Sequence, residues 1–355
     1  MNTNQLAGAC IMTGIRGASL DDPICRADVD LLKARHVKGV ILFSTHLPTG
    51  GMRNIVSENQ VKQFTQDLRN ELGSDLLIGI DQEGGSVNRL EIFQDAGVSS
   101  MLSAKMQGSM GKAQIQATIS TVAKSLAASG INLVFAPCVD LEINPNNPII
   151  AQKGRSLGRD PERVASAAAS IIDAYHSLGV RCCIKHFPGH GSSTTDTHLG
   201  IADITHTQHA DEQRVYELLI ESMRSGTTPN AAVMTGHLVH QSIDSLPASL
   251  SHAHTTTNLR EKLGFDGLVF TDSIDMGAVR QHHDAGAAAV LALHAGADIV
   301  LDGFNAPDEA SHHPSILIHD AIIRSLELGE IDESMLAASS ERRSAFLDGD
   351  TDNLV

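Results

Sequence analysis

The sequence predicts an α/β fold, a single (β/α)₈ TIM barrel, and three observations support this prediction. Short apolar runs that end in polar residues recur along the chain, and eight of them can be distinguished. Longer segments with a helical pattern separate most of these runs, and this alternation implies parallel strands joined by helical crossovers. Eight strand–helix units fit a chain of 355 residues as one barrel.

The expected elements can be placed along the chain. One helix is expected at Val164–Leu178, because Asp160-Pro161-Glu162 is a good helix start, and another at the alanine-rich segment Ala285–Ala295. The expected strands are Ala9–Ile15, Gly39–Phe43, Leu76–Asp81, Asn132–Ala136, Arg181–His186, Ala231–Thr235, Gly267–Asp272 and Asp298–Asp302.

An open doubly wound sheet is the alternative arrangement of the same elements. No glycine-rich dinucleotide fingerprint follows the first strand, which weakens that alternative. No low-complexity linker interrupts the chain. We therefore expect one catalytic domain, the TIM barrel, over residues 1–347, followed by a polar tail over residues 348–355 that frays.

Composition limits the classes of function. Hydrophobic residues make up 42% of the chain, charged residues 19%, and the formal net charge is −16. This acidic balance argues against nucleic-acid and anionic-membrane partners, which select clustered lysine and arginine. The chain has neither a signal-peptide pattern nor an apolar run of membrane length, and we expect a cytoplasmic monomer without a cofactor or metal.

The cysteines support a reducing environment. They number five, an odd count, and they are scattered as Cys10, Cys25, Cys138, Cys182 and Cys183. Cys182 and Cys183 are adjacent in an apolar strand, so their side chains are expected on opposite faces, as buried small hydrophobic groups.

Aromatic residues are scarce, and this scarcity bears on the size of a substrate. They make up 3% of the chain, and tryptophan is absent. Proteins that bind long polysaccharides usually stack the sugars on aromatic side chains, so the composition favours a small, end-acting substrate.

Polar and charged residues gather where the expected strands end. In a barrel all these ends face the C-terminal mouth, where barrel enzymes place their chemistry. The polar ends are Asp81 to Gly85 with Arg89, Ala136 to Asp140, Lys185 to Gly191, Thr235 to His237, and Asp272 with Ser273.

Asp272 ends an otherwise apolar strand and is a candidate nucleophile. A partly desolvated carboxylate at the barrel mouth can attack an anomeric carbon. The alternative role is an N-cap for the helix that follows.

The segment 191–198 is rich in small polar residues and predicts a loop that holds Asp196 and His198. A carboxylate two residues from an imidazole can orient the ring and raise its basicity, which makes a general acid/base. The alternative is a solvated loop with an incidental histidine, since the chain has 18 histidines.

Candidate sugar-binding residues complete the site. Arg89, Arg155, Lys185 and His186 offer donors to hydroxyl groups, and Asp81 offers two acceptors to a pair of vicinal hydroxyls. The alternative is that these charges are structural and pair with each other.

These residues resemble glycoside hydrolase family 3, specifically its NagZ-type β-N-acetylglucosaminidases, over about residues 5–305. The resemblance rests on motifs that occur in the same order in the family. They are Asp81-Gln82-Glu83-Gly84-Gly85 with Arg89, Gly154-Arg155-Ser156-Leu157-Gly158 with Asp160-Pro161, Lys185-His186-Phe187-Pro188-Gly189-His190-Gly191, Asp196-Thr197-His198, and Thr271-Asp272-Ser273 with Met276.

The resemblance implies a TIM barrel and a retaining, two-step mechanism. It implies Asp272 as nucleophile, His198 as acid/base and Asp196 as the residue that tunes His198. It also implies that Asp81, Arg89, Arg155, Lys185 and His186 bind a non-reducing terminal N-acetylglucosamine. The expected substrate is a small glycan or muropeptide with terminal GlcNAc, and the expected role is peptidoglycan recycling.

The chain departs from the family pattern at several positions. Ser192-Ser193 stands where Asp-Thr is usual, Thr197 where Ser is usual, and Gly236 where Ala is usual. The second strand ends in Phe-Ser-Thr-His and lacks the usual Arg-Asn. These departures leave the aglycone preference open.

Three other functions remain compatible with the sequence. A β-N-acetylglucosaminide phosphorylase would keep the site and use phosphate in place of water. A metal-dependent hydrolase could use His186, His190, His198 and Asp196. A non-catalytic sugar-binding protein would bind GlcNAc without turnover.

Overall fold

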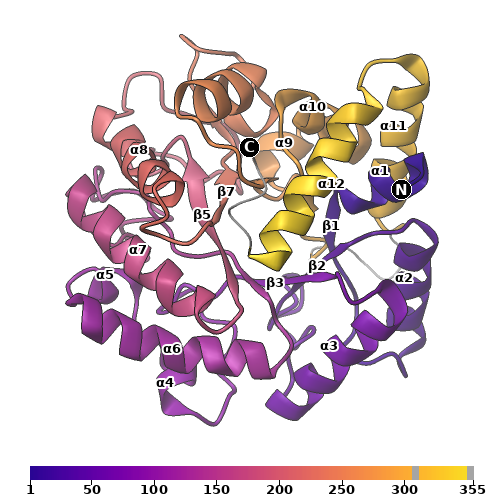
Figure 1. The fold of residues 1–355 in the computed structure, drawn as a ribbon, viewed down its shortest axis with the longest axis horizontal. Coiled ribbons are helices and arrows are strands. Elements are labelled where there is room, and N and C mark those ends of the chain that lie inside the picture. Colours follow the sequence, from indigo (N-terminus) through magenta and orange to yellow (C-terminus); the bar gives the residue numbers. More distant parts are fainter. Residues whose placement is uncertain (306–311, 350–355) are drawn as a thin grey trace.

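The computed structural model describes residues 1–305 and 312–349, which contain a nearly closed barrel of parallel strands within a ring of helices (Figure 1). The eight-stranded sheet has the order β10-β1-β2-β3-β4-β5-β7-β9. A parallel bridge between Phe270 and Ile299 joins its two end strands. The barrel prediction is therefore confirmed, and the open doubly wound sheet is wrong.

Every expected strand of the barrel is present, with shorter bounds in seven of the eight and with one more residue, Phe187, in β5. The first one starts later than expected because Ala9 ends a helix instead, α1, which a capping box of Asn2 and Gln5 opens. The strands are β1 (Ile11–Gly14), β2 (Gly39–Leu42), β3 (Leu77–Ile80), β4 (Leu133–Val134), β5 (Arg181–Phe187), β7 (Ala232–Thr235), β9 (Val269–Thr271) and β10 (Val300–Asp302), with a separate parallel pair, β6 (Ala202–Asp203) and β8 (Leu238–Val239).

The helices cover the outside of the barrel. Asp160 caps α7 by accepting from the amide of Arg163, as the Asp-Pro start predicts. The helices are α1 (Thr3–Ala9), α2 (Pro23–Ala34), α3 (Glu58–Leu72), α4 (Ala96–Ser99), α5 (Ala104–Gln107), α6 (Lys112–Ala128), α7 (Pro161–His176), α8 (Ala210–Arg224), α9 (Gly277–Arg280), α10 (Ala285–Ala295), α11 (Ser315–Leu328) and α12 (Glu333–Asp348), with a 3₁₀ turn η1 (Ala248–Leu250) and a π-helical segment η2 (Ala253–Lys262).

Alternate residues of each strand face two separate hydrophobic layers. One layer fills the barrel and contains Phe135 and Phe270, whose ring centroids lie 5.5 Å apart in an edge-to-face arrangement. The other lies between the barrel and the helices. Cys182 belongs to the outer layer and Cys183 to the inner one, as the alternation predicts. All five cysteines are buried and free.

Helix α12 closes the N-terminal end of the barrel. Its Phe346 joins the inner hydrophobic layer, and its Arg343 and Arg342 pair with Asp75 and Asp298, each just before a strand. The opposite, C-terminal end is therefore the open one. Of the expected tail, residues 350–355 lie outside the described residues. None of the described helices is long and apolar enough to cross a membrane.

Segment η2 buries His254 without a hydrogen-bond partner for either ring nitrogen. Burial, and after it the neighbouring His240, lower the pKa of His254 from 6.5 to about 4, although Asp244 opposes them. The unfolded chain binds a proton at this ring below about pH 6.5 and the folded chain does not, so stability falls as the pH falls from about 6.5 to 4.

Replacing His254 with leucine should remove this pH dependence. With pKa values of 6.5 unfolded and about 4 folded, wild type should lose about 2 kcal/mol more than His254→Leu between pH 8 and pH 5. Urea unfolding at both pH values measures the difference. The exposed His252 on the same segment gives the control, His252→Leu, which should titrate like wild type. Equal pH slopes for wild type and His254→Leu would refute the assignment.

Candidate active site

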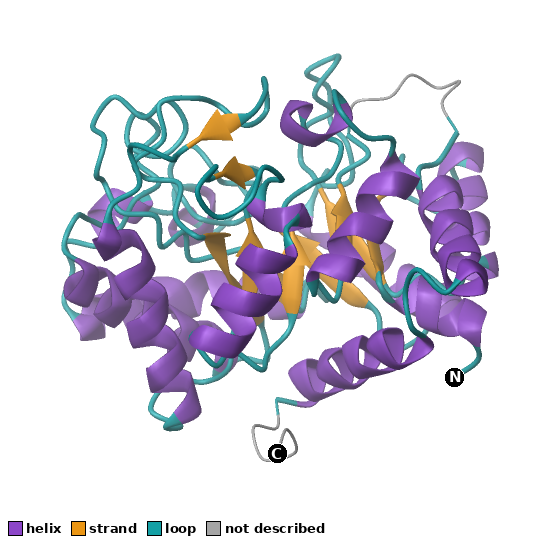
Figure 2. Cartoon of the chain, turned by 90° about the horizontal axis from the view of Figure 1, so that it is seen from above, coloured by secondary structure: helices purple, strands orange, loops and turns teal. Residues whose placement is uncertain are grey.

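A cleft of about 560 Å³ opens at the C-terminal ends of the strands. Loops gather over this end of the sheet, while the helices lie at its sides (Figure 2). All the residues that the sequence proposed for the site line this cleft, from β5 and from the segments that follow β3, β4, β5 and β9. They are Asp81, Arg89, Arg155, Lys185, His186, Asp196, His198 and Asp272.

A buried ion-pair network forms one wall of the cleft. Lys185 Nζ lies 2.7 Å from Asp81 Oδ1 and 2.8 Å from Glu83 Oε1. Arg155 donates two hydrogen bonds to the same Glu83 carboxylate, from Nε to Oε2 at 2.8 Å and from Nη2 to Oε1 at 2.9 Å. Burial alone would raise the pKa of Glu83, but the two cations hold it far below its usual range. Asp81, Lys185 and Arg155 thus form ion pairs within the protein, which is what the structural alternative for these residues predicts. They also line the cleft.

Lys185 and His186 both reach the cleft because β5 is irregular there. Lys185 pairs with Met234 of β7, and Phe187 pairs with the next residue of β7, Thr235. His186 is therefore an extra residue of β5 that has no partner on β7. A bulge of this kind breaks the alternation of side chains. His186 therefore joins Lys185 on the inner side, while Phe187 packs outward on Tyr216.

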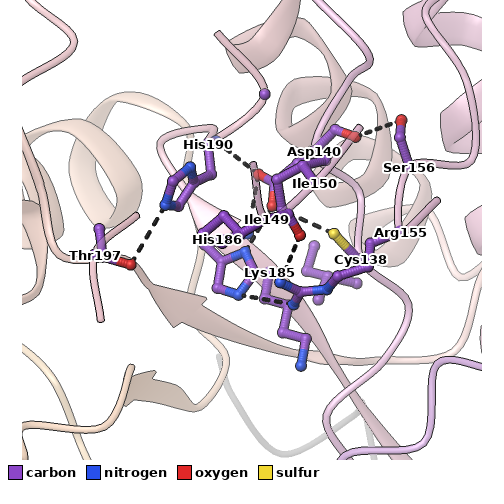
Figure 3. A network of polar contacts seen from close by, with 12 residues as sticks. Cys138, Asp140, Ile149, Ile150, Arg155, Ser156, Lys185, His186, His190 and Thr197 are labelled. Carbon is purple, nitrogen blue, oxygen red and sulfur yellow. Dashed lines mark hydrogen bonds and ion pairs between the residues drawn. The ribbon is translucent and has the colours of Figure 1, made fainter. Parts of the chain in front are cut away.

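Asp140 fixes the orientation of His186 (Figure 3). Its carboxylate accepts four hydrogen bonds, from His186 Nδ1 at 2.6 Å, the amides of His186 and His190 at 3.2 and 2.7 Å, and Cys138 Sγ at 3.3 Å. Burial alone would raise the pKa of Asp140, but its histidine neighbours keep it well below the usual range. Because Nδ1 faces Asp140, the other ring nitrogen, Nε2, is left for the cleft side, 3.5 Å from Arg155 Nη2.

The residues of the metal-hydrolase alternative do not form a single group. Among the described residues, the set whose ligand atoms lie within 4.8 Å of one another is Cys138, Asp140 and His186. These three residues lie together because Asp140 accepts hydrogen bonds from both Cys138 and His186. His198 and Asp196 lie apart from it, on the loop after β5.

Asp272 follows β9 and sits at the bottom of the cleft. Its amide donates to Thr235 O at 2.8 Å, and its Oδ1 accepts from the amide of Ser273 at 2.8 Å. The next helix, α9, has Met276 at its N-cap position, so the N-cap interpretation of Asp272 is wrong. Burial raises the pKa of Asp272, but the imidazoles of His237, His186 and His198 outweigh burial and lower it, which favours the carboxylate.

His237 supports the segment after Asp272. Its Nε2 lies 2.7 Å from Ser273 O and its Nδ1 2.7 Å from Ser249 Oγ. Since a carbonyl can only accept, Nε2 carries the proton and Nδ1 accepts from the hydroxyl. Burial lowers the pKa of His237, which favours this neutral form.

Asp196 and His198 form the expected pair. Oδ1 of Asp196 accepts from His198 Nδ1 at 2.7 Å and from the His198 amide at 2.9 Å. Burial raises the pKa of Asp196, but these two bonds to His198 lower it overall. The His198 side chain is 59% exposed. The ring therefore stands at the cleft wall with Nδ1 held and Nε2 available to a ligand.

The loop that holds this pair is anchored at its start. The Ser192 amide donates to Glu212 Oε1 at 3.0 Å, Asn144 Nδ2 donates to Ser193 O at 3.0 Å, and Asn147 Nδ2 donates to His190 O at 2.7 Å. Burial raises the pKa of Glu212 to about 7. These anchors come from α8 and from the loop after β4, and they hold the loop close to the barrel.

Three buried residues of the site had no role assigned from the sequence. Glu83 lies two positions after Asp81, and in an extended segment that spacing places both side chains on one face. Asp140 and His237 stood at strand ends, but their partners are distant in sequence. Arg89 lines the cleft, and among the described residues its side chain forms no ion pair and its Nε lacks a partner.

Comparison with protein families gives one match that covers most of the chain. Residues 15–344 match the glycosyl hydrolase family 3 N-terminal domain. A beta-hexosaminidase of Xylella fastidiosa (strain 9a5c) is 32% identical over 300 residues, which cover 82% of each chain. Beta-hexosaminidase A of Pseudoalteromonas piscicida is 28% identical over 327 residues, 85% of this chain, and this chain spans 53% of that protein.

Solved structures of similar proteins have the same fold. A family 3 beta-N-acetylglucosaminidase from Paenibacillus sp. str. FPU-7 superposes with a TM-score of 0.85 at 29% identity, over 98% of this chain and 62% of that one. A beta-N-acetylhexosaminidase from Beutenbergia cavernae DSM 12333 superposes with a TM-score of 0.82 at 29% identity, over 98% of this chain and 99% of that one.

Proposed function

The chain belongs to glycosyl hydrolase family 3, and on that premise we propose that it is a retaining exo-β-N-acetylglucosaminidase. It removes the non-reducing terminal β-linked GlcNAc from small glycans or muropeptides. The observation that carries this proposal is the convergence, in one cleft, of a half-buried carboxylate with lowered pKa and an Asp–His pair whose histidine is exposed.

The first step forms a covalent glycosyl-enzyme. Asp272 attacks the anomeric carbon while protonated His198 donates its Nε2 proton to the glycosidic oxygen, so the C–O bond to the leaving group breaks and an ester bond to Asp272 forms. Asp196 holds Nδ1 and stabilises the imidazolium before the transfer.

The second step releases the sugar. Neutral His198 takes a proton from water, the oxygen of that water attacks the anomeric carbon from the face that the leaving group vacated, and the ester bond to Asp272 breaks. Two inversions give net retention. His198 is protonated again, and Asp272 is again a carboxylate.

The wall opposite the dyad holds the sugar. We assign Asp81, Arg89, Arg155, Lys185 and His186 to the hydroxyl groups of the terminal GlcNAc. Lys185 and Arg155 are already held by Glu83, so they meet the sugar in a fixed geometry and lose little side-chain entropy on binding. Arg89 has no ion pair among the described residues, so its guanidinium donors are free for a ligand.

The biological assignment extends the same proposal. We propose that the enzyme acts as a monomer in the cytoplasm, in peptidoglycan recycling, on muropeptides that carry terminal GlcNAc. The low aromatic content favours a small substrate over a long polysaccharide, and a cleft of about 560 Å³ has room for one.

Replacement of His198 by alanine tests the acid/base assignment. On an aryl N-acetyl-β-glucosaminide with a poor leaving group, kcat/KM should fall by roughly 10²- to 10⁴-fold, the usual contribution of general acid catalysis. On the 2,4-dinitrophenyl glycoside kcat/KM should change little, because that leaving group needs no proton.

His209 offers a matched control for this variant. It is similarly exposed and also lies beside an aspartate, with Nδ1 3.2 Å from Asp211 Oδ2, but it does not line the cleft. His209→Ala should keep wild-type kcat/KM on both substrates. Equal losses on both substrates in His198→Ala would contradict the role of His198 as acid.

A further inference from the structure

The tip of the dyad loop is held by burial only at Thr197, whose Oγ1 lies 3.4 Å from His190 Nε2. The side chain of His198 is 59% exposed, and the next residue, Leu199, is 77% exposed although it is apolar. A general acid must stand at hydrogen-bond distance from the glycosidic oxygen, and its position must be held to within roughly half an ångström to be effective. Some other contact must therefore fix the position of His198.

The segment that follows Asp272 supplies this contact. The amide of Gly277 donates to His198 O at 3.3 Å, and the amide of Ala278 donates to Thr197 O at 3.1 Å. Gln281 Nε2 donates to Leu199 O at 3.1 Å. Three consecutive carbonyls of the loop tip thus accept hydrogen bonds from residues 277–281.

Gly277 allows the loop to approach this closely. A Cβ atom built on Gly277 would lie 2.6 Å from His198 O. Real Cβ atoms do not approach a backbone oxygen at that distance, so any side chain at 277 must push the loop away. The backbone of the acid/base residue therefore rests directly on a glycine.

The donors and the nucleophile belong to one rigid stretch of chain. His237 binds Ser273 O, the amide of Ile274 donates to Leu301 O, and Ser273 Oγ accepts from the amide of Gly303. These bonds fix residues 273 and 274 against the barrel, and the buried side chains of Ala278 and Val279 anchor the stretch 277–281. A loop docked on residues 277–281 is consequently placed relative to the nucleophile.

We propose that Gln281 and Gly277 are positioning residues for the acid/base, which latch the dyad loop so that His198 stands at a fixed place relative to Asp272. This inference rests on the proposed function. Neither residue touches the substrate. Gln281 acts through its side-chain amide on Leu199 O, and Gly277 acts through its missing side chain and its amide on His198 O.

The first test removes the side-chain donor. Gln281→Met keeps the length of the side chain but cannot donate a hydrogen bond. It should lower kcat/KM roughly tenfold on a poor-leaving-group aryl glycoside, and less than about twofold on the 2,4-dinitrophenyl glycoside, because only the former depends on the acid. Gln213→Met on α8 is the matched control, since Gln213 is an exposed helical glutamine whose partner is Glu217, away from the cleft. The control should keep wild-type values on both substrates.

The second test displaces the loop. Gly277→Ala should produce the same selective loss, and a larger one, because the added methyl group cannot be accommodated without moving His198. Gly111→Ala is the control, since Gly111 has a φ of −76° and no atom closer than 4.0 Å to an added Cβ. The thermal midpoints of all four variants establish that each is folded.

A double-mutant cycle separates this latch from the proposed function. In a His198→Ala background, Gln281→Met should have no further effect on the poor-leaving-group substrate, because the residue that it positions is gone. Full activity of His198→Ala alone would overturn the acid/base assignment. A selective loss in His198→Ala with no loss in Gln281→Met and Gly277→Ala would overturn the latch alone. Equal losses of the two latch variants on both substrates would also overturn it. So would an undiminished effect of Gln281→Met in the His198→Ala background.

Discussion

Asp272→Ala is expected to lower kcat/KM roughly 10⁴- to 10⁶-fold on every N-acetyl-β-glucosaminide, whatever its leaving group, because removal of a catalytic nucleophile costs up to this order of magnitude. The carboxylate ends a buried strand, its amide is tied to Thr235 O at 2.8 Å, and its pKa is lowered by the surrounding imidazoles. Asp81 follows β3 in the same way and also lines the cleft, but it is paired with Lys185 at 2.7 Å, whereas Asp272 has no such ion pair among the described residues. Steady-state kinetics with good and poor leaving groups measures the loss.

Asp266 provides the control for this variant. It is an exposed aspartate just before β9, at the opposite end of the same strand, and Asp266→Ala should keep wild-type kinetics. Unfolding curves for both variants show whether the barrel is intact. Substantial turnover by a folded Asp272→Ala would refute the covalent mechanism.

Azide distinguishes the roles of Asp272 and His198 by stereochemistry. In Asp272→Ala, azide can take the place of the missing carboxylate while His198 still protonates the leaving group, so the product should be the α-glycosyl azide, with inversion. In His198→Ala the covalent intermediate still forms from an activated substrate, and azide should then give the β-glycosyl azide. The opposite pairing of products would exchange the two assignments.

The fold could be predicted from the sequence because the barrel repeats one simple pattern. Each apolar run is short, and each ends where polar residues begin, so the strands could be located within a few residues. The differences from the prediction arise where tertiary contacts decide. Ala9 ends a helix because α1 buries Leu6 to Ala9 where it packs on α11 and α12, and β6 and β8 are two-residue strands that have no periodicity to detect.

The candidate site residues line one cleft, as their position at strand ends led us to expect, and the family resemblance that ordered them is confirmed. Their pairing could not be predicted. Both Lys185 and His186 face the cleft only because a bulge interrupts β5, and a bulge leaves no composition signal. The latch contact joins Gln281 to Leu199 across 82 residues, so nothing local in the sequence indicates it.

The role of Glu83 is hidden in the sequence for the same reason, because its partners Lys185 and Arg155 are distant from it along the chain. We expect this residue to matter strongly for stability. Its carboxylate, with 1% of the side chain exposed, is the shared partner of Lys185 and Arg155. Glu83→Gln leaves two buried cations with only Asp81 as a nearby anion, and it places an amide donor against their N–H groups. Breaking a buried ion pair on one side typically costs about 3–5 kcal/mol.

Glu83→Gln should accordingly lower the free energy of unfolding by about 3–5 kcal/mol, measured by urea titration. Glu142→Gln is the matched control, because Glu142 pairs with the exposed Lys105 at 3.1 Å and such surface pairs contribute less than about 1 kcal/mol. If both substitutions lower the free energy of unfolding equally, the ion-pair network around Glu83 does not stabilise this wall of the cleft. If Glu83→Gln costs more but also raises KM for the aryl glycosides while Glu142→Gln does not, the same carboxylate both stabilises the barrel mouth and holds Lys185 and Arg155 in the geometry that binds the sugar.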